Sequence, residues 1–144
     1  MLIAGRLIFG DCHSFWNFSS SIAPMLENAA LICMALNLYH EGRSEPLLGQ
    51  VGIVHVTRNR AKGKQENVCK VVYAHSQFSW TLTNPKVTDL KEFDKALHTA
   101  VIAWQFSDIT SGSNHYHHVS IRPYWIHKMK FTMKLGSHLY YRSK

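Results

Sequence analysis

Two glutamates, Glu41 and Glu45, lie four residues apart within residues 36–50, which read LNLYHEGRSEPLLGQ. Glu41 follows an apolar run and is therefore expected at the rim of a core. A carboxyl group beside apolar walls loses solvation when it ionises, so its pKa rises and it can hold a proton near neutral pH. Such a group can protonate a departing oxygen as a general acid. The alternative is a structural ion pair between Glu41 and Arg43 or Arg60.

Glu45 has two interpretations. It is a candidate second carboxylate beside Glu41, because two carboxyl groups can divide the roles of acid and base between them. Its structural alternative is to cap a helix or hold Arg43. Gly42 and Pro46 indicate that the backbone bends here, so the distance between the two carboxyl groups does not follow from their spacing.

Helices must position these carboxyl groups. Apolar residues at three- and four-residue steps predict a first helix that begins at Pro24, with Ser20 or Ser21 as its cap, and ends near Glu41. Its inward positions are Ala30, Leu31, Met34, Ala35 and Leu38. A second helix is predicted over residues 46–60, with Leu48, Val51, Val54 and His55 facing inward.

The rest of the chain predicts an α+β fold. A third helix is expected over residues 90–106, with Leu90, Phe93, Leu97, Val101 and Trp104 on one face. Residues 68–73 form a short helix or strand. Alternating apolar residues on both sides of Gly136 and Ser137 predict a hairpin near the C-terminus. The expected architecture is a mainly helical domain with a small antiparallel sheet.

Composition favours one domain over residues 1–144, since 46% of the residues are hydrophobic and only 17% are charged. Residues 1–24 are apolar enough to be expected to pack on this domain. No apolar run reaches the roughly 20 residues of a membrane helix. The opening residues do not match a secretory signal, so any export route, such as a holin, is not visible in the sequence.

The charge and cysteine content restrict the partners and the compartment. The net charge of +7 favours polyanions, but Lys and Arg are spread along the chain and do not predict specific nucleic-acid binding. Cys12, Cys33 and Cys69 are an odd number without metal-like spacing. We expect free thiols made in a reducing compartment, with Cys33 as a small core residue.

Residues 75–80 read HSQFSW and combine hydrogen-bonding groups with aromatic faces, a mixture that suits sugar rings and extended polymers. Phe78 and Trp80 are equally typical of core anchors. Residues 114–119 read NHYHHV, and the four histidines within residues 115–127 raise the question of a metal. Their spacing matches no known zinc motif, so we predict no metal and expect them to line a polar groove or to satisfy one another.

In order along the chain, these patches resemble the catalytic domain of the cell-wall hydrolase family that includes spore-cortex-lytic enzymes and many phage lysins. The patches are YHEGRSEPLLGQ, VCKVVY, QFSW, HYH, PYW and LGSHLYYR. They cover about residues 28–142. The resemblance implies a lysozyme-like layout with Glu41 as the catalytic acid, although Gly42 and Ser44 replace the usual Ala and Gly. Family motifs and residue type together suggest groove residues at Gln77, Ser79, Trp80, His115, Tyr116 and Trp125.

The resemblance further implies cleavage of peptidoglycan between N-acetylmuramic acid and N-acetylglucosamine, without a cofactor, by a monomer acting on the cell wall. A single strong carboxyl candidate favours a lytic transglycosylase, and a second carboxylate would instead indicate a muramidase-type hydrolase. The absence of a tandem domain favours a compact phage lysin or a lone wall hydrolase. Two other classes remain: a metal-dependent wall amidase that uses the histidines, and a non-catalytic basic module that binds the envelope.

Overall fold

The computed structural model describes residues 28–144 of the chain. The segment predicted to pack on the domain, residues 1–24, lies outside this part, together with the predicted helix start at Pro24 and with Cys12. The helices are α2 (Ala29–Gly42), α3 (Leu47–Arg60), α4 (Val68–Val72), α5 (Trp80–Thr83) and α6 (Leu90–Gln105), with 3₁₀ turns η1 (Gln65–Asn67) and η2 (Tyr124–Lys128). The strands are β1 (His115–His118), β2 (Met129–Leu135) and β3 (His138–Ser143).

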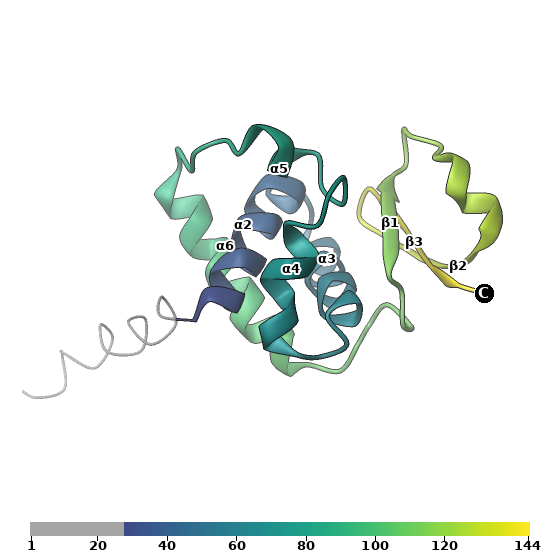
Figure 1. The fold of residues 1–144 in the computed structure, drawn as a ribbon, viewed down its shortest axis with the longest axis horizontal. Coiled ribbons are helices and arrows are strands. Elements are labelled where there is room, and N and C mark those ends of the chain that lie inside the picture. The colour runs from purple at the N-terminus through teal and green to yellow at the C-terminus, as the bar shows by residue number, and fades with distance from the viewer. Residues whose placement is uncertain (1–27) are drawn as a thin grey trace, which may run out of the picture.

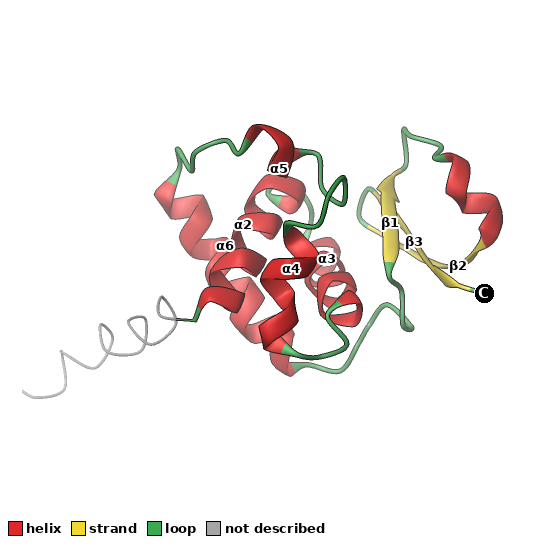
Figure 2. Ribbon diagram, in the orientation of Figure 1, coloured by secondary structure: helices red, strands yellow, loops and turns green. Residues whose placement is uncertain are grey.

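The elements form two lobes (Figure 1). Helices α2 to α6 make the larger lobe, and the three strands with η2 make the smaller one, as the colouring by secondary structure shows (Figure 2). This arrangement confirms the predicted α+β fold, with helices first and a small antiparallel sheet near the C-terminus. Within residues 28–144, every helix is too short or too polar to cross a membrane.

Helix α2 lies at the centre of the helical lobe. Asn28 caps it, because the side-chain oxygen accepts a hydrogen bond from the backbone N–H of Ala30 at 3.0 Å. Met34 and Leu38 are almost fully buried, as the periodicity predicted. The last turn of this buried helix carries Glu41, so the position of that carboxyl group is fixed by the core.

The buried faces of α3 and α6 differ from the prediction at two positions. Leu48 is 61% exposed and Leu90 is 76% exposed, because each lies in the first turn of its helix, beyond the edge of the core. Small residues form most of the buried face of α6, namely Ala96, Ala100 and Ala103 together with Leu97. Small side chains allow two helix backbones to approach closely, and α6 makes extensive contacts with α2. Phe93 adds a larger group at this contact, because its ring meets that of Tyr39 in α2 at 6.2 Å.

Cys33 and Cys69 form a disulfide between α2 and α4, so the prediction of free thiols was wrong for this pair. Their sequence separation of 36 residues gives no hint of proximity. The pair meets because α4 packs on α2, which brings the two Cα atoms to 5.3 Å, a usual distance for a disulfide. The bond also indicates an oxidising compartment, in contrast to the reducing one that we expected.

The sheet has the order β1-β3-β2, and both pairings are antiparallel. The predicted hairpin is confirmed, with β2 and β3 joined at Gly136 and Ser137. Gly136 has a φ of +57°, and a Cβ there would clash with the Glu45 carboxylate. Glycine is therefore required both by the turn and by the close approach of the helical lobe.

The hairpin contacts the helical lobe through buried polar groups. Tyr140 is fully buried, and its hydroxyl donates a hydrogen bond to the carbonyl of Gly49 in α3 at 3.1 Å. Gly52 in the same helix faces the Tyr140 ring, and a Cβ at position 52 would lie 2.5 Å from the hydroxyl oxygen. The lobes are thus packed together at this junction.

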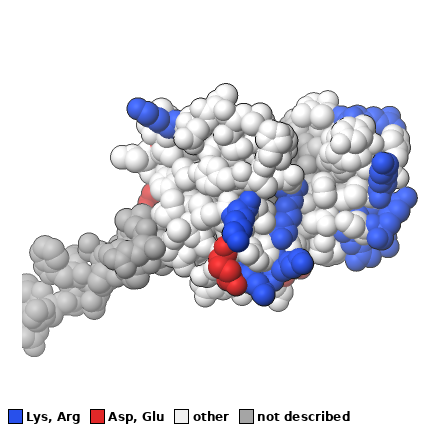
Figure 3. Space-filling model, in the orientation of Figure 1, with Lys and Arg blue, Asp and Glu red and all other residues white. Residues whose placement is uncertain are grey.

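The two lobes differ in their acidic residues. In the view of Figure 3, the helical lobe shows Asp and Glu together with Lys and Arg, whereas the charged side chains over the sheet are Lys and Arg. The last acidic residue of the chain is Asp108, which lies between α6 and β1. The smaller lobe therefore has no acidic side chain of its own.

Candidate functional site

A pocket of about 320 Å³ lies between the two lobes. The helical lobe contributes Glu41, Arg60, Gln77, Phe78 and Ser79, and the sheet lobe contributes Tyr116, His117, His118, Ile121, Pro123, Trp125 and His138. Glu41 is the carboxylate among these lining residues. Two further hollows adjoin the pocket: one of about 360 Å³ shares Arg60 and Gln77 with it, and one of about 210 Å³ shares Glu41. Together they form a groove with Glu41 within it.

Glu41 has the environment of a general acid. It lies in the last turn of α2 and is only partly exposed to solvent. Burial raises the pKa of its carboxyl group, while the charge of Arg60 and the Tyr116 hydroxyl oppose this rise. The net shift is upward because desolvation is the largest effect. A raised pKa increases the protonated fraction near neutral pH, which the predicted chemistry requires.

Arg60 is the cation of the pocket. It ends α3, and its Nε donates a hydrogen bond of 2.5 Å to the carbonyl of Asn114, just before β1. Its guanidinium carbon lies 5.3 Å from the centroid of the Phe78 ring. Within residues 28–144, the buried Nη1 of Arg60 has no hydrogen-bond partner. This leaves a donor that can serve a ligand or a newly ionised carboxylate.

Tyr116 lies on the opposite wall, in β1. Its hydroxyl is buried and makes no hydrogen bond of regular geometry within the described part of the chain. Burial and the negative charge of Glu41 raise the pKa of this phenol well above its usual value, so it remains protonated. Its ring meets that of His138 edge-on at 5.0 Å. Tyr116 is therefore a neutral donor close to Glu41.

The other predicted groove residues fall into three groups. Gln77, Ser79 and Trp125 line the pocket with Glu41. His115 lines the adjoining hollow, and its ring lies 5.1 Å from that of Trp125. Trp80 is outside the pocket lining and is 7% exposed, with its Nε1–H donating to Asn37 at 3.0 Å. Trp80 is therefore a core residue, which was the alternative to a role in contacting sugar rings.

Glu45 is turned away from the pocket. Its carboxylate accepts a hydrogen bond from the backbone N–H of Ser137 at 2.8 Å and lies 3.5 Å from Nδ1 of His138. It is 9% exposed and belongs to the junction between the lobes. Neither Arg43 nor a helix cap is its partner, because the bend after Gly42 directs Glu45 toward the hairpin turn.

Comparison with known proteins agrees with this geometry. The family model described as cell wall hydrolase matches residues 44–141, which include nearly all of both pocket walls. The chain belongs to the cell-wall hydrolase family. The match begins three residues after Glu41 and so does not itself include the candidate acid.

Solved structures resemble this cell-wall hydrolase over most of its length. The crystal structure of the catalytic domain of the Bacillus cereus SleB protein matches with a TM-score of 0.66 and 25% identity, covering 78% of this chain and 89% of that one. The catalytic domain of the germination-specific lytic transglycosylase SleB from Bacillus anthracis matches with a TM-score of 0.67 and 24% identity, covering 78% and 93%. No curated protein matches the chain.

Several pocket residues of the hydrolase escaped the sequence analysis. Arg60 was considered only as an ion-pair partner, and His138 was not assigned to the groove, whereas His117 and His118 line it as one of the two expectations for the histidines. Their signal was weak because helix and strand periodicity show which residues share a face, but not which face meets the other lobe. His117 also has both ring nitrogens engaged, with the carbonyl of His118 at 2.8 Å and the Tyr141 hydroxyl at 3.1 Å.

Among residues 28–144, no three His, Cys, Asp or Glu side chains gather as metal ligands.

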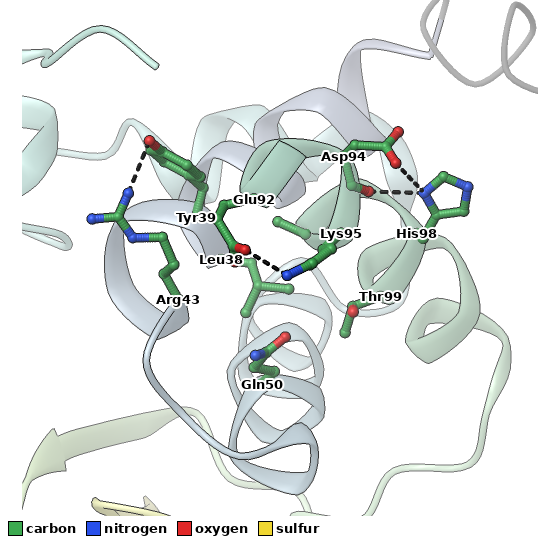
Figure 4. A pocket seen from close by; sticks show the side chains of 10 residues that line it. Leu38, Tyr39, Arg43, Gln50, Glu92, Asp94, Lys95, His98 and Thr99 are labelled. Atoms are coloured by element: carbon green, nitrogen blue, oxygen red, sulfur yellow. Dashed lines mark hydrogen bonds and ion pairs between the residues drawn. The ribbon is translucent and has the colours of Figure 1, made fainter. Parts of the chain in front are cut away.

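A second pocket of the hydrolase, of about 460 Å³, lies between α2, α3 and α6 (Figure 4). Its charged groups pair with one another. Lys95 contacts Glu92 at 2.5 Å, and His98 lies 3.5 Å from Asp94. Its carboxylates, Glu92 and Asp94, thus already have partners on the same helix, and neither faces the sheet lobe as Glu41 does. The candidate active site remains the pocket between the lobes.

Proposed function

We propose that this domain is a lytic transglycosylase that cleaves the glycan strand of peptidoglycan between N-acetylmuramic acid and N-acetylglucosamine. Family membership supports an enzyme of the bacterial cell wall. One observation carries the finer proposal: among the described residues that line the pocket, Glu41 is the carboxylate, and Glu45 is held by the hairpin turn. A hydrolase that uses two carboxyl groups needs both at the scissile bond.

In the first step, protonated Glu41 donates its proton to the glycosidic oxygen. The bond between this oxygen and the anomeric carbon breaks, and positive charge builds on the muramic acid ring. In the second step, the 6-hydroxyl of the same sugar attacks the anomeric carbon. The Glu41 carboxylate accepts the proton of that hydroxyl, so the acid is regenerated and a 1,6-anhydro ring closes. No water enters the product.

Arg60 and Tyr116 assist by stabilising Glu41 after it has lost its proton. Burial favours the protonated form, whereas the cation and the hydroxyl favour the carboxylate. Nη1 of Arg60 and the hydroxyl of Tyr116 are buried and have no hydrogen-bond partner within residues 28–144. A pKa raised by burial and limited by these two donors allows one carboxyl group to act first as an acid and then as a base.

Gln77, Ser79 and Trp125 are the proposed contacts to the glycan. The amide and the hydroxyl can bind sugar hydroxyl groups, and the indole offers a flat apolar face. His115, in the adjoining hollow, is placed to contact a neighbouring sugar. The fold is shared with a protein described as a lytic transglycosylase, so a domain of this fold can accommodate the proposed reaction.

Mass spectrometry of fragments released from purified peptidoglycan tests the proposal. Wild-type protein is expected to release fragments that end in anhydro-muramic acid. Glu41→Gln keeps the size of the side chain but removes the acid, and its rate is expected to fall by about 10²–10⁴-fold. The matched control is Glu92→Gln, which removes a carboxylate from the other pocket and should leave the rate unchanged.

The alternative reactions give different results. Reducing sugar ends would indicate a muramidase, and Glu45→Gln would then be tested for loss of activity. Free peptides with intact glycan strands would indicate an amidase. If Glu41→Gln cleaved peptidoglycan as fast as the wild type, the assignment of the acid would be refuted.

A further inference from the structure

The smaller lobe carries cations without acidic partners. The 36 residues from 109 to 144 contain six Lys and Arg and no Asp or Glu. All nine acidic residues of the protein precede position 109. Within residues 28–144, no Lys or Arg of this lobe forms an ion pair with a carboxylate. The net charge of the protein is therefore concentrated where the active-site function does not explain it.

Four of these cations gather at the open end of the hairpin. Lys130 in β2 lies directly opposite Arg142 in β3. At the next position toward the open end, Met129 pairs with Ser143. Lys128 precedes Met129, and Lys144 follows Ser143 and donates a hydrogen bond from Nζ to the carbonyl of His127. We call Lys128, Lys130, Arg142 and Lys144 the hairpin cation cluster.

The hairpin cation cluster is unfavourable for the isolated protein. Like charges directly opposite each other on neighbouring strands destabilise a sheet. All four side chains are exposed, and no carboxylate lies within the same lobe to neutralise them. An anionic surface that contacts the cluster would remove this repulsion and bind with a favourable electrostatic free energy.

The apolar side chains of the same lobe indicate what kind of anionic surface this is. Phe131 follows Lys130 on β2, an edge strand of the sheet, and is 52% exposed. The two side chains project from opposite faces, so a surface that contacts both does so along this edge. Tyr124, which begins η2, is 85% exposed. Cations combined with exposed aromatic rings are typical of proteins that lie on a membrane surface, where the rings enter the headgroup boundary. A soluble polyanion would use the cations but gain little from the rings.

We propose that the hairpin cation cluster, together with Phe131, binds anionic phospholipid headgroups and holds the enzyme on a membrane surface. None of these residues lines the pocket around Glu41, so the bound enzyme keeps its groove open to a glycan strand. Association with the surface needs no membrane-crossing helix. This inference concerns attachment and is independent of the bond that the enzyme cleaves.

Vesicle co-sedimentation of the full chain tests the proposal. We expect binding to vesicles of phosphatidylglycerol mixed into phosphatidylcholine, and loss of binding in high salt or with phosphatidylcholine alone. Each cation near an anionic membrane contributes about a 5-fold increase in partitioning, so Lys130→Gln with Arg142→Gln should weaken binding by about 30-fold. The matched control, Lys86→Gln with Lys91→Gln, removes the same charge from exposed positions of the helical lobe and should weaken binding only slightly.

The apolar contribution has its own pair of variants. Phe131→Ala should weaken binding by about 5-fold, and this factor should be the same at every salt concentration at which binding is measurable. Phe106→Ala removes an equally exposed ring, at the end of α6, and should have no effect. Circular dichroism and cleavage of soluble glycan fragments confirm that each variant is folded, since none touches the pocket.

Two results would overturn the proposal. Equal losses in the hairpin and control charge variants would mean that only net charge matters. Binding to a soluble teichoic acid with no binding to the anionic vesicles would assign the cluster to a wall polymer in place of a membrane.

Discussion

The disulfide between Cys33 and Cys69 makes a quantitative prediction about stability. Both residues are only partly exposed and join α2, which carries Glu41, to α4. Replacing both with Ala removes the cross-link and little apolar volume. The main effect is therefore on the unfolded chain, which gains the conformational freedom of a loop that the bond had closed.

The magnitude follows from the size of the loop. A sequence separation of 36 residues corresponds to about 4 kcal/mol of lost loop-closure entropy at room temperature. For a domain of 144 residues, this is a large fraction of the total free energy of unfolding. With a slope of about 4 kcal/mol per molar guanidinium, the midpoint of unfolding should fall by about 1 M.

Chemical denaturation of the wild type and of the double variant Cys33→Ala with Cys69→Ala measures this change. Reduced wild type should behave like the variant, and titration of the oxidised, denatured protein should find one free thiol, that of Cys12. Three free thiols in oxidised protein, or equal midpoints with equal slopes, would refute the reasoning. Activity at a temperature where both forms are folded should be unchanged, because the bond does not reach the pocket.

Three further predictions concern the pocket, the core and the junction. Burial raises the pKa of Glu41, so activity should fall as pH increases through that pKa. The charge of Arg60 opposes the rise, so Arg60→Gln should raise the pKa further and move the fall in activity to higher pH. A pH–rate profile of this variant that shifts to lower pH would contradict the reasoning. Burial lowers the pKa of His55 in the folded state, so its contribution to stability is complete above the ordinary histidine pKa and is lost as pH falls below it. Denaturation midpoints at several pH values should show this loss for the wild type and a weaker one for His55→Gln. Gly52→Ala places a methyl group against Tyr140 and should cost about 1–3 kcal/mol, measured by thermal unfolding; Tyr140→Phe in the same chain should recover part of this loss, and strict additivity would contradict the contact.

The local elements of this fold could be predicted from the sequence because their signals are local. The four-residue spacing of Met34 and Leu38 predicted the buried face of α2, and Gly136 predicted the turn of the hairpin. The raised pKa of Glu41 followed from one apolar helix that ends in a carboxyl group. These features depend on neighbours within a few residues, which a sequence displays directly.

The contacts between elements could not be predicted in the same way. Glu45 binds a turn 92 residues away, and nothing near Glu45 in the sequence encodes this partner. Leu48 has the right spacing for a buried residue, yet it lies beyond the edge of the core. Tryptophan occurs both in binding sites and in cores, and Trp80 is in the core because Asn37 offers its indole N–H a buried acceptor. In each case, packing between distant segments determined the outcome.

The junction between Glu45 and the hairpin turn also has a consequence for biosynthesis. The ribosome releases Glu41 on α2 well before residues 115–141, which form the second wall of the groove. Contacts that span 91 and 92 residues form late, because long loops must close before such contacts can stabilise the chain. A nascent chain therefore carries Glu41 on a completed helix but has no groove around it. The groove forms only when the hairpin docks on the helical lobe, so the candidate site is among the last parts of the fold to be completed.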